Sequence, residues 1–276
     1  MKKWFAVIGD PIAQSKSPNM HHAWYEEEGI DAAYIPLHVT AENLGQAVQS
    51  LKLLGASGWN VTIPHKQSII PFLDELDELA EKMGAVNTIV RMEDGRLKGY
   101  NIDGPGFVRS LEEAIGTDYR EERLLLIGAG GAARGIAFAL QQIGYKHITI
   151  ANRTLANAEA IIQEMGAGEA VTLEEAENAL DAYKIFIQTT PAGMSTGDFN
   201  LPFSLEKFPE GAIAADIVYN PLMTPFLCAA EAKGAKIVNG LGMFVHQGAI
   251  AYQYWLGDYP NTNGMIARLT EQLGGK

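Results

Sequence analysis

Short runs of apolar residues alternate with segments of helical periodicity along almost the whole chain. The runs are typical of strands, and the segments between them, in which apolar residues recur every three or four positions, are typical of amphipathic helices. In the first part of the chain this pattern predicts strands at residues 4–8, 33–38 and 59–63 and a hairpin at 88–91 and 96–99. Because strands and helices alternate, the fold class is α/β with largely parallel sheets.

Three helices are predicted between these strands. The first begins at Ser17, because a hydroxyl N-cap with proline at the first helical position is a strong helix start, and it reaches about residue 28. The second covers about residues 41–54 and the third about residues 67–83. The third contains an acidic run that we interpret as a solvated helix face, formed by Asp74, Glu75, Asp77, Glu78 and Glu81.

A continuous apolar strand at residues 123–127 opens the second part of the chain and suits the centre of a parallel sheet. After a glycine-rich turn, the pattern alternates again. Helices are predicted at about 132–143 and 156–165, and strands at 147–151, 184–189, 212–217 and 235–238. Two amphipathic helices, at about 245–256 and 262–273, end the chain.

The length of 276 residues fits two compact domains. We predict an open, mostly parallel α/β substrate domain at residues 1–103 and a Rossmann-type dinucleotide-binding domain at 104–240. The helices of residues 241–276 are predicted to pack back on the first domain and complete it.

Composition narrows the classes of partner. The formal net charge of −12 argues against nucleic acid or an anionic membrane surface, so a small molecule is the expected partner of a monomer or homodimer. No apolar run reaches the ~18 residues of a membrane helix, and the first residues lack the apolar region of a signal peptide, which indicates the cytoplasm. The single cysteine, Cys228, lies in an apolar run and is expected to be buried.

The six histidines show no metal-ligand spacing, so no metal is expected. His21 and His22 are adjacent on the first predicted helix and are interpreted as partly exposed.

A glycine-rich turn predicts dinucleotide binding. Residues 128–133 read Gly-Ala-Gly-Gly-Ala-Ala, the pattern G-x-G-x-x-A, directly after a strand and at the start of a helix. In that position the glycines let the backbone approach a pyrophosphate, whose charge meets the N-terminus of the helix. The expected contacts are Gly128, Ala129, Gly130, Gly131 and Ala132.

The end of the next strand indicates which dinucleotide binds. An NAD enzyme would normally carry an acidic residue here for the ribose 2′-hydroxyl, but the chain has Arg153, which suits a 2′-phosphate. NADP is therefore the expected cofactor.

Polar residues also gather where the first sheet should end. Ser15 and Ser17 follow the first strand, and Ser15 has no evident structural task. Asn60 and Thr62 alternate with apolar residues on the third strand, so both should point to one face at the carboxyl end of the sheet, where ligands bind in open α/β sheets.

A lysine and an aspartate complete this cluster. Lys66 stands just before the helix predicted at 67–83, where the helix dipole disfavours a cation by a few tenths to about 1 kcal/mol, so a functional role is favoured. Asp103 lies in the predicted joint between the domains. A lysine can move the proton of an alcohol or ketone oxygen, and a nearby carboxylate can orient it.

Several motifs together resemble the shikimate dehydrogenase family along the whole chain. In the first half they are Gly-Asp-Pro-Ile-Ala-Gln-Ser-Lys-Ser-Pro at 9–18, Asn-Val-Thr-Ile-Pro-His-Lys at 60–66, Gly-Ala-Val-Asn-Thr at 84–88 and Gly-Tyr-Asn-Ile-Asp at 99–103. In the second half they are Asn-Arg-Thr at 152–154, Thr-Pro-Ala-Gly-Met at 190–194, Asp-Ile-Val-Tyr-Asn-Pro at 216–221, and Gly-Leu-Gly-Met at 240–243 extending through Gln247.

The resemblance implies reversible reduction of 3-dehydroshikimate to shikimate with NADPH, and it assigns roles to residues. Lys66 and Asp103 would be the catalytic pair. With Asn60, the substrate would be held by Ser15, Ser17, Thr62, Asn87, Tyr219 and Gln247. Beyond the glycine-rich turn, the expected cofactor contacts are Asn152, Arg153, Thr154, Asn157, Glu78, Thr190, Ile217, Gly240 and Met243.

Two alternatives stay open at this point. Many family members that use NADP carry a second basic residue where this chain has Asn157, so a quinate/shikimate dehydrogenase that also accepts NAD is the nearest alternative. From a different class, the chain could be a non-catalytic relative that senses the nucleotide. Retention of both Lys66 and Asp103 argues against that.

Overall fold

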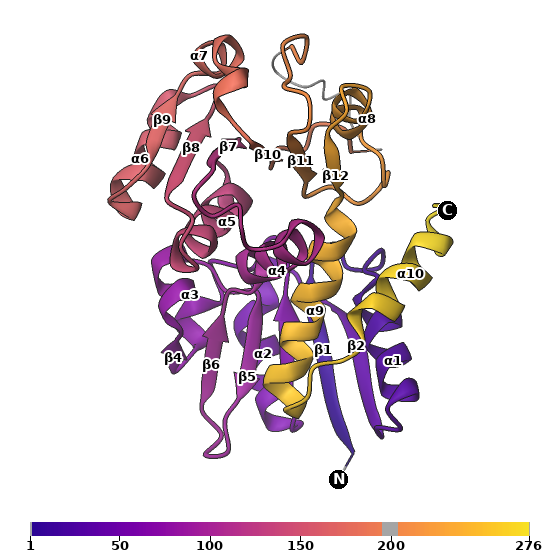
Figure 1. Cartoon of the computed structure of the whole chain (residues 1–276). Coiled ribbons are helices and arrows are strands. Elements are labelled where there is room, and N and C mark those ends of the chain that lie inside the picture. Colours follow the sequence, from indigo (N-terminus) through magenta and orange to yellow (C-terminus); the bar gives the residue numbers. More distant parts are fainter. Residues whose placement is uncertain (1, 195–203, 276) are drawn as a thin grey trace. The chain divides into compact units, whose positions relative to one another are not determined.

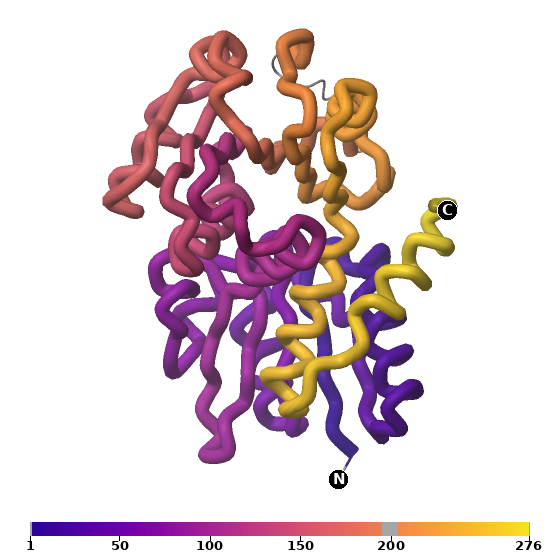
Figure 2. The backbone as a smooth tube through the Cα atoms, viewed as in Figure 1, coloured from indigo at the N-terminus to yellow at the C-terminus, as the bar shows by residue number. Residues whose placement is uncertain are grey.

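The computed structural model describes residues 2–194 and 204–275. The chain forms two compact units, one of Met1–Ile102 with Gln247–Met265 and one of Asp103–His246 with Ile266–Lys276. Helix α9 (Gly240–Leu256) begins in the second unit and ends in the first, as the tube in Figure 2 shows. The domain boundaries expected from the sequence stay a prediction.

The first unit is built on a mixed sheet in the order β2-β1-β3-β5-β6-β4 (Figure 1). Its strands are β1 (Lys3–Gly9), β2 (Ala32–His38), β3 (Gly58–Val61), β4 (Glu75–Leu76), β5 (Thr88–Arg91) and β6 (Leu97–Tyr100). β1 runs parallel to both β2 and β3, whereas β5 is antiparallel to β3 and β6. The carboxyl ends of β1 and β3 therefore meet at one edge, and the polar residues predicted for the substrate follow them.

The helices of this unit are α1 (Ser17–Glu27), α2 (Leu44–Leu53) and α3 (Glu78–Met83), with 3₁₀ turns at Ala41–Asn43 and Ile70–Phe72. The prediction of one helix over residues 67–83 is wrong, because only the last part of this segment, α3, is α-helical. Strand β4 interrupts it by pairing with β6. Asp77 then has an extended backbone, and its carboxylate caps α3 by accepting from the backbone N–H groups of Leu79 and Ala80. The acidic run is therefore not one helix face.

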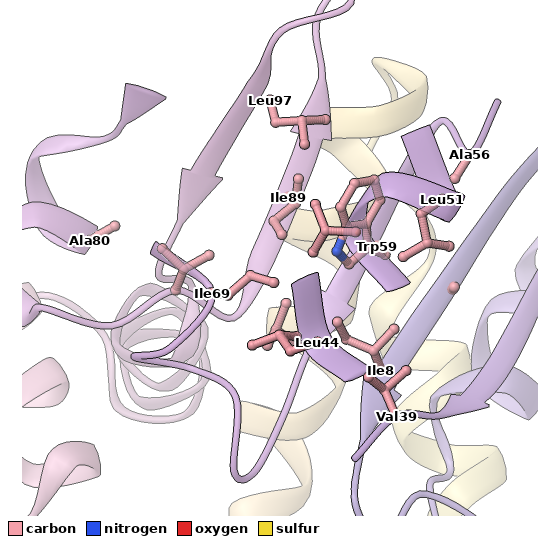
Figure 3. Close-up of a cluster of buried hydrophobic side chains, with 14 residues drawn as sticks. Ile8, Val39, Leu44, Leu51, Ala56, Trp59, Ile69, Ala80, Ile89 and Leu97 are labelled. Atoms are coloured by element: carbon pink, nitrogen blue, oxygen red, sulfur yellow. The ribbon is translucent and has the colours of Figure 1, made fainter. Parts of the chain in front are cut away.

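Alternation along the strands gives the sheet two apolar faces. On one face Trp59, Ile8 and Ile89 pack with the α2 residues Leu44 and Leu51 (Figure 3). On the other face α9 lies so close to β3 that a Cβ atom at Gly58 would be 2.2 Å from Nε1 of Trp255. That indole nitrogen donates to the Ile89 carbonyl oxygen at 3.0 Å, which holds α9 on the sheet.

The second face also contains an aromatic cluster with a histidine inside it. His21 is fully buried, so its interpretation as a partly exposed residue is wrong. Its ring stacks on Tyr34, with centroids 4.3 Å apart, because α1 turns this residue toward the sheet. Burial lowers the pKa of His21 to about 3. His22, next to it, is exposed, as expected.

The second unit is built on a sheet in the order β12-β11-β10-β7-β8-β9, in which every pair is parallel. Its strands are β7 (Arg123–Ile127), β8 (His147–Ala151), β9 (Glu169–Val171), β10 (Ile185–Gln188), β11 (Ile213–Asp216) and β12 (Lys236–Val238). Numbered within the unit, this is the order 3-2-1-4-5-6 of a Rossmann fold. The predicted α/β class with two sheets rich in parallel strands is confirmed.

The helices of this unit are α4 (Asp103–Ile115), α5 (Gly131–Gln142), α6 (Leu155–Met165), α7 (Leu173–Asn178) and α8 (Pro225–Glu231), with a 3₁₀ turn at Leu180–Ala182; α10 (Thr262–Gln272) spans the last boundary between the units. Neither β9 nor helices α4, α7 and α8 were expected from the sequence. Helix α4 was missed because Gly104 and Gly106 resemble a loop. A Cβ atom at Gly104 would lie 2.2 Å from the Gly135 carbonyl oxygen, so this glycine lets α4 pack closely on α5.

Cys228 is exposed, so the expectation that it is buried is wrong. The apolar run that contains it forms α8, and that helix turns Phe226, Leu227 and Ala230 toward the core. Cys228 lies on the opposite side of the same helix.

Candidate functional site

The glycine-rich turn follows β7 and has the geometry of a close backbone approach. Gly128 has a φ of +110°, which side-chain-bearing residues rarely adopt. A Cβ atom there would be 2.7 Å from Oγ1 of Thr189 and 2.9 Å from Cγ2 of Thr190. Only glycine therefore fits at the first position of the turn.

The N-terminus of α5 stands open beside this turn. Gly130 is the N-cap and makes no side-chain cap, so the first N–H groups of the helix are directed outward. A Cβ atom at Gly130 or Gly131 would meet nothing within 4 Å, whereas Ala133 is fully buried against the sheet. An anionic group such as a pyrophosphate can approach the backbone here.

Sheet topology places the turn at the usual position of a ligand. β7 and β10 are neighbours, and the connection after β7 leads to β8 on one side whereas the connection after β10 leads to β11 on the other, so their carboxyl ends form a switch point. Thr189 and Thr190 follow β10 at the same edge, and Oγ1 of Thr189 donates to the Ile127 carbonyl oxygen at 2.7 Å. This bond holds the loop after β10 beside the glycine-rich turn.

Arg153 lies in the next loop, after β8, and is exposed. Asn152 shapes the loop by donating from Nδ2 to the Thr154 carbonyl oxygen at 2.9 Å. Thr154 is the N-cap of α6 without a side-chain cap, and Asn157 lies in the first turn of that helix. An arginine beside an uncapped helix start can hold a phosphate ester.

β11 ends on a buried acid, Asp216, to which the sequence analysis assigned no role. Asp216 accepts from the Val218 N–H at 2.9 Å and from the Thr224 hydroxyl at 2.7 Å. Burial raises the pKa of Asp216 to about 6, although these hydrogen bonds act against the shift. An acid at the end of an apolar strand was the available signal. Asp216 holds the loop of Ile217 and Tyr219.

Three further expected contacts lie in or beside this loop, namely Tyr219, Gly240 and Met243. A Cβ atom at Gly240 would be 2.2 Å from the Ile217 carbonyl oxygen, so a glycine is required at the start of α9. The Tyr219 ring stacks on Phe244, with centroids 5.0 Å apart, and burial raises the pKa of Tyr219. Met243 is half-buried on the same helix.

In the first unit, the loop after β1 brings two serines together. Helix α1 has Lys16 as its N-cap and no side-chain cap, so the expectation that Ser17 caps the helix is wrong. Ser15 accepts from the Ser17 N–H at 3.4 Å, a long contact that gives it only a weak structural task. Both side chains are half-buried.

Asn60 is buried and its amide is used within the protein. Its Oδ1 accepts from the Tyr34 hydroxyl at 2.6 Å, and its Nδ2 donates to the Asn87 carbonyl oxygen at 3.2 Å and to Oγ1 of Thr88 at 2.9 Å. The Asn60 amide therefore connects Tyr34 on β2 to Asn87 and Thr88. Asn87 accepts through Oδ1 from the Ile102 N–H at 3.0 Å, and its Nδ2 makes no hydrogen bond within residues 2–194 and 204–275.

Lys66 lies in a turn beyond β3 and is half-buried. No α-helix follows it directly, so the helix-dipole reason for singling it out is wrong. Its carbonyl oxygen accepts from the Val86 N–H at 2.7 Å, and the N–H of Thr62 donates to the Ile8 carbonyl oxygen at 3.0 Å. These two backbone hydrogen bonds join the segment that carries Thr62 and Lys66 to β1 on one side and to the segment before β5 on the other.

The remaining expected residues are divided between the units. Asp103 is the first residue of α4 in the second unit, and Gln247 is the first residue of α9 assigned to the first unit; both are half-buried. Glu78, at the start of α3, is exposed and forms an ion pair of 2.6 Å with Lys82. The described part of the chain has no group of side chains suited to a metal ion and no helix long and apolar enough to cross a membrane.

Models of protein families match three stretches of the chain. Residues 7–89 match the shikimate dehydrogenase substrate binding domain, residues 110–195 match shikimate / quinate 5-dehydrogenase, and residues 240–270 match the shikimate 5′-dehydrogenase C-terminal domain. The matched stretches contain both serines, Lys66, the glycine-rich turn and Gln247.

Whole proteins are similar over the full length. A shikimate dehydrogenase (NADP(+)) of Lysinibacillus sphaericus (strain C3-41) is 68% identical over 275 residues, which cover 100% of both chains. A shikimate dehydrogenase crystallised in complex with NADP+ is 39% identical with a TM-score of 0.90, over 99% of this chain and 96% of that one. Shikimate 5-dehydrogenase from Thermus thermophilus, in complex with NADP(H) and shikimate, is 36% identical with a TM-score of 0.87, over 98% and 99%.

Proposed function

The chain belongs to the shikimate dehydrogenase family, and we propose that it performs the reaction of that family through Lys66 and Asp103. It is an oxidoreductase that acts on a CH–OH group with NADP as cofactor. The reaction is the reversible reduction of 3-dehydroshikimate to shikimate, a step of aromatic biosynthesis. The observation that carries the proposal is the 68% identity with a shikimate dehydrogenase over the whole length of both chains.

The residues around the glycine-rich turn fit NADP. The open N-terminus of α5 suits the pyrophosphate, and Arg153 beside the uncapped start of α6 suits the 2′-phosphate. Thr190, Ile217, Gly240 and Met243 would line the nicotinamide end, and we assign Glu78 there as well. When bound, NADP supplies or accepts the hydride.

Lys66 and Asp103 would then handle the proton of the reacting oxygen. Lys66 gives a proton to the carbonyl oxygen during reduction and takes it back during oxidation, and its charge stabilises negative charge on that oxygen. Asp103 would orient the ammonium group and bind a hydroxyl of the substrate.

The other polar residues would hold the substrate. Ser15 and Ser17 lie at the carboxyl end of β1, where they can bind a carboxylate and a hydroxyl. Thr62 and the Nδ2 group of Asn87 would take further hydroxyls, with Tyr219 and Gln247 contributing from the loop after β11 and from α9. Asn60, whose amide is engaged within the protein, would keep Asn87 in place.

Initial rates with shikimate and with quinate, each with NADP+ and NAD+, test this function. We expect the highest kcat/KM for shikimate with NADP+. A preference for quinate with NAD+ would favour the broader quinate/shikimate dehydrogenase, for which Asn157 is the supporting observation. Binding of NADP+ without any turnover would favour a non-catalytic nucleotide sensor.

We place the enzyme in the cytoplasm as a monomer or homodimer. The support is its dependence on a diffusible nicotinamide cofactor and a net charge of −12, which disfavours anionic membrane surfaces. Size-exclusion chromatography with light scattering would decide between the two assemblies.

A further inference from the structure

The side chain of Gln188 is buried at the end of β10 and binds the loop that follows this strand. Gln188 is the last residue of β10 and is fully buried. Its side-chain oxygen accepts from the Thr190 N–H, and its Nε2 donates to the carbonyl oxygens of Thr190 at 3.0 Å and of Ala192 at 3.1 Å. One side chain therefore binds both backbone polar groups of Thr190.

These three hydrogen bonds require the chemistry of an amide. They need one acceptor atom and one donor group with two hydrogens on the same side chain, and a glutamine amide offers both. The orientation of the amide follows, because the atom that faces two carbonyl oxygens must be the nitrogen. A leucine at this position would make none of the bonds, and an ionised glutamate could only accept.

The backbone of Gln188 is fixed by the centre of the sheet. β10 lies between β7 and β11, and Gln188 is in register with Ile127 and Asp216. Its own carbonyl oxygen accepts from the Ile217 N–H at 3.2 Å. The amide is thus anchored on a central strand, and through it the position of Thr190 is tied to the sheet.

The Thr190 side chain lies against the glycine-rich turn. Its Cγ2 atom would be 2.9 Å from a Cβ atom at Gly128, so the methyl group packs on the first glycine of the turn. Its Oγ1 accepts from the Ala192 N–H at 3.2 Å, a bond that does not use the hydrogen of the hydroxyl. Because Thr190 is half-buried, this hydrogen can be donated to a ligand at the edge of the sheet.

We propose that Gln188 is a positioning residue of the cofactor site, which holds the Thr190 hydroxyl where it donates to an oxygen of the nicotinamide half of NADP. The proposal rests on the proposed function, in which Thr190 lies at the nicotinamide end and Arg153 at the 2′-phosphate. Gln188 is fully buried and acts only through Thr190. Loss of its amide should therefore weaken one half of the cofactor site and leave the other half intact.

The test compares Gln188→Leu with a matched control, Gln141→Leu, by titration calorimetry. Gln141 lies near the end of α5 in the same unit, where its Nε2 donates to the Met165 carbonyl oxygen at 3.0 Å. The two ligands are NADP+ and adenosine 2′,5′-bisphosphate, which has the 2′-phosphate but lacks the nicotinamide half. We expect Gln188→Leu to weaken NADP+ about three- to tenfold, the usual worth of one hydrogen bond, and to leave the bisphosphate unchanged. Gln141→Leu should change neither affinity.

A double-mutant cycle separates positioning from mere stability. In a Thr190→Val background, Gln188→Leu should have no further effect on the affinity for NADP+, whereas its effect on the melting temperature should persist. An unchanged NADP+ affinity in Gln188→Leu, equal losses for both ligands, or the same loss with and without the Thr190 hydroxyl would overturn the proposal. Failure of the proposed function is distinguishable, because the unmodified protein would then not oxidise shikimate with NADP+.

A measurement on the unmodified protein covers the case in which Gln188→Leu does not fold. With nitrogen-labelled glutamine, the side-chain NH₂ group of Gln188 should give NMR signals that show a nuclear Overhauser effect to the Thr190 N–H. We expect saturation with NADP+ to shift these signals and adenosine 2′,5′-bisphosphate to leave them in place. Signals that ignore NADP+, or that respond equally to both ligands, overturn the proposal.

Discussion

His65 is the residue directly before Lys66, and its Nε2 atom lies 2.6 Å from the carbonyl oxygen of Val39. Because a carbonyl oxygen only accepts, Nε2 must carry a hydrogen and donate it. His65 is fully buried, and the N–H of Val39 in turn donates to the Gly9 carbonyl oxygen at 3.1 Å. The turn that carries Lys66 is thus tied to the loop that leads to the substrate serines.

Removing this donor should misplace Lys66. We expect His65→Phe to lower kcat several-fold and to change the KM for NADP+ little, because the lysine turn loses its anchor while the second unit is untouched. His65→Gln, whose amide can donate to the same carbonyl, should restore most of kcat. Steady-state kinetics with thermal melting measure both. A lower melting temperature with normal kcat would mean that the bond only stabilises the fold.

Arg153 should decide between the two cofactors. A hydrogen bond to a charged group contributes roughly 1.5–3 kcal/mol, or about 10- to 150-fold. Arg153→Ala should therefore weaken NADP+ binding by about that factor and leave NAD+ nearly unchanged, as measured by titration calorimetry. Arg123→Ala is the control, because Arg123 begins β7 at the other end of the same sheet and pairs with Glu169. Equal losses for both cofactors would show that Arg153 has a structural role.

Ser15 is the cleaner probe of carboxylate binding. The only hydrogen bond of its side chain within the described ranges is the long one with the Ser17 N–H, so Ser15→Ala should hardly change the melting temperature. We expect the KM for shikimate to rise several-fold and the affinity for NADP+ to stay the same. If instead the melting temperature falls by several degrees while shikimate kinetics are normal, Ser15 holds the turn and the carboxylate is bound elsewhere.

His21 should make the first unit sensitive to acid. Its pKa is about 3 in the folded protein and 6.5 in the unfolded chain, so the unfolded chain binds the proton first and stability falls as pH decreases from about 6.5 toward 3. The loss is on the order of 1.4 kcal/mol per pH unit within that window. His21→Leu should reduce this slope in urea titrations at several pH values. His147→Gln, at an exposed histidine, should keep it, and an unchanged slope in His21→Leu would contradict the assignment.

The repeating pattern predicted most elements because strands and helices there follow local periodicity. β7 and β8 begin and end as predicted, since each is a short, mostly apolar run that follows a polar segment. Tertiary contacts decided the exceptions. Residues 67–83 have a helical composition, but β4 pairs with β6 and Asp77 caps a shorter helix. Helix α4 was hidden because Gly104 serves packing on α5 and not a loop.

The candidate site was predictable where a local motif carries the chemistry. The glycine-rich turn, Arg153 and the two serines are of this kind. Residues that act within the fold were harder to find. Tyr34 looks like an ordinary strand residue, and only the sheet brings it to Asn60. Asp216 stands out as an acid at the end of an apolar strand, but the sequence does not show that it holds the loop through Thr224. Lys66 was singled out for a reason that the structure removes, so its role depends on family resemblance and on the experiment below.

The turnover of Lys66→Ala tests the central claim most directly. If Lys66 moves the proton of the reacting oxygen, kcat should fall by ~10²–10⁴-fold with a smaller change in KM. Asp103→Asn should be similarly damaging, and the double variant should be far less impaired than the product of the two single effects, because the pair acts as one unit. A Lys66→Ala turnover within about threefold of the unmodified enzyme, against the ~10²-fold minimum of a positioned acid or base, would contradict the account.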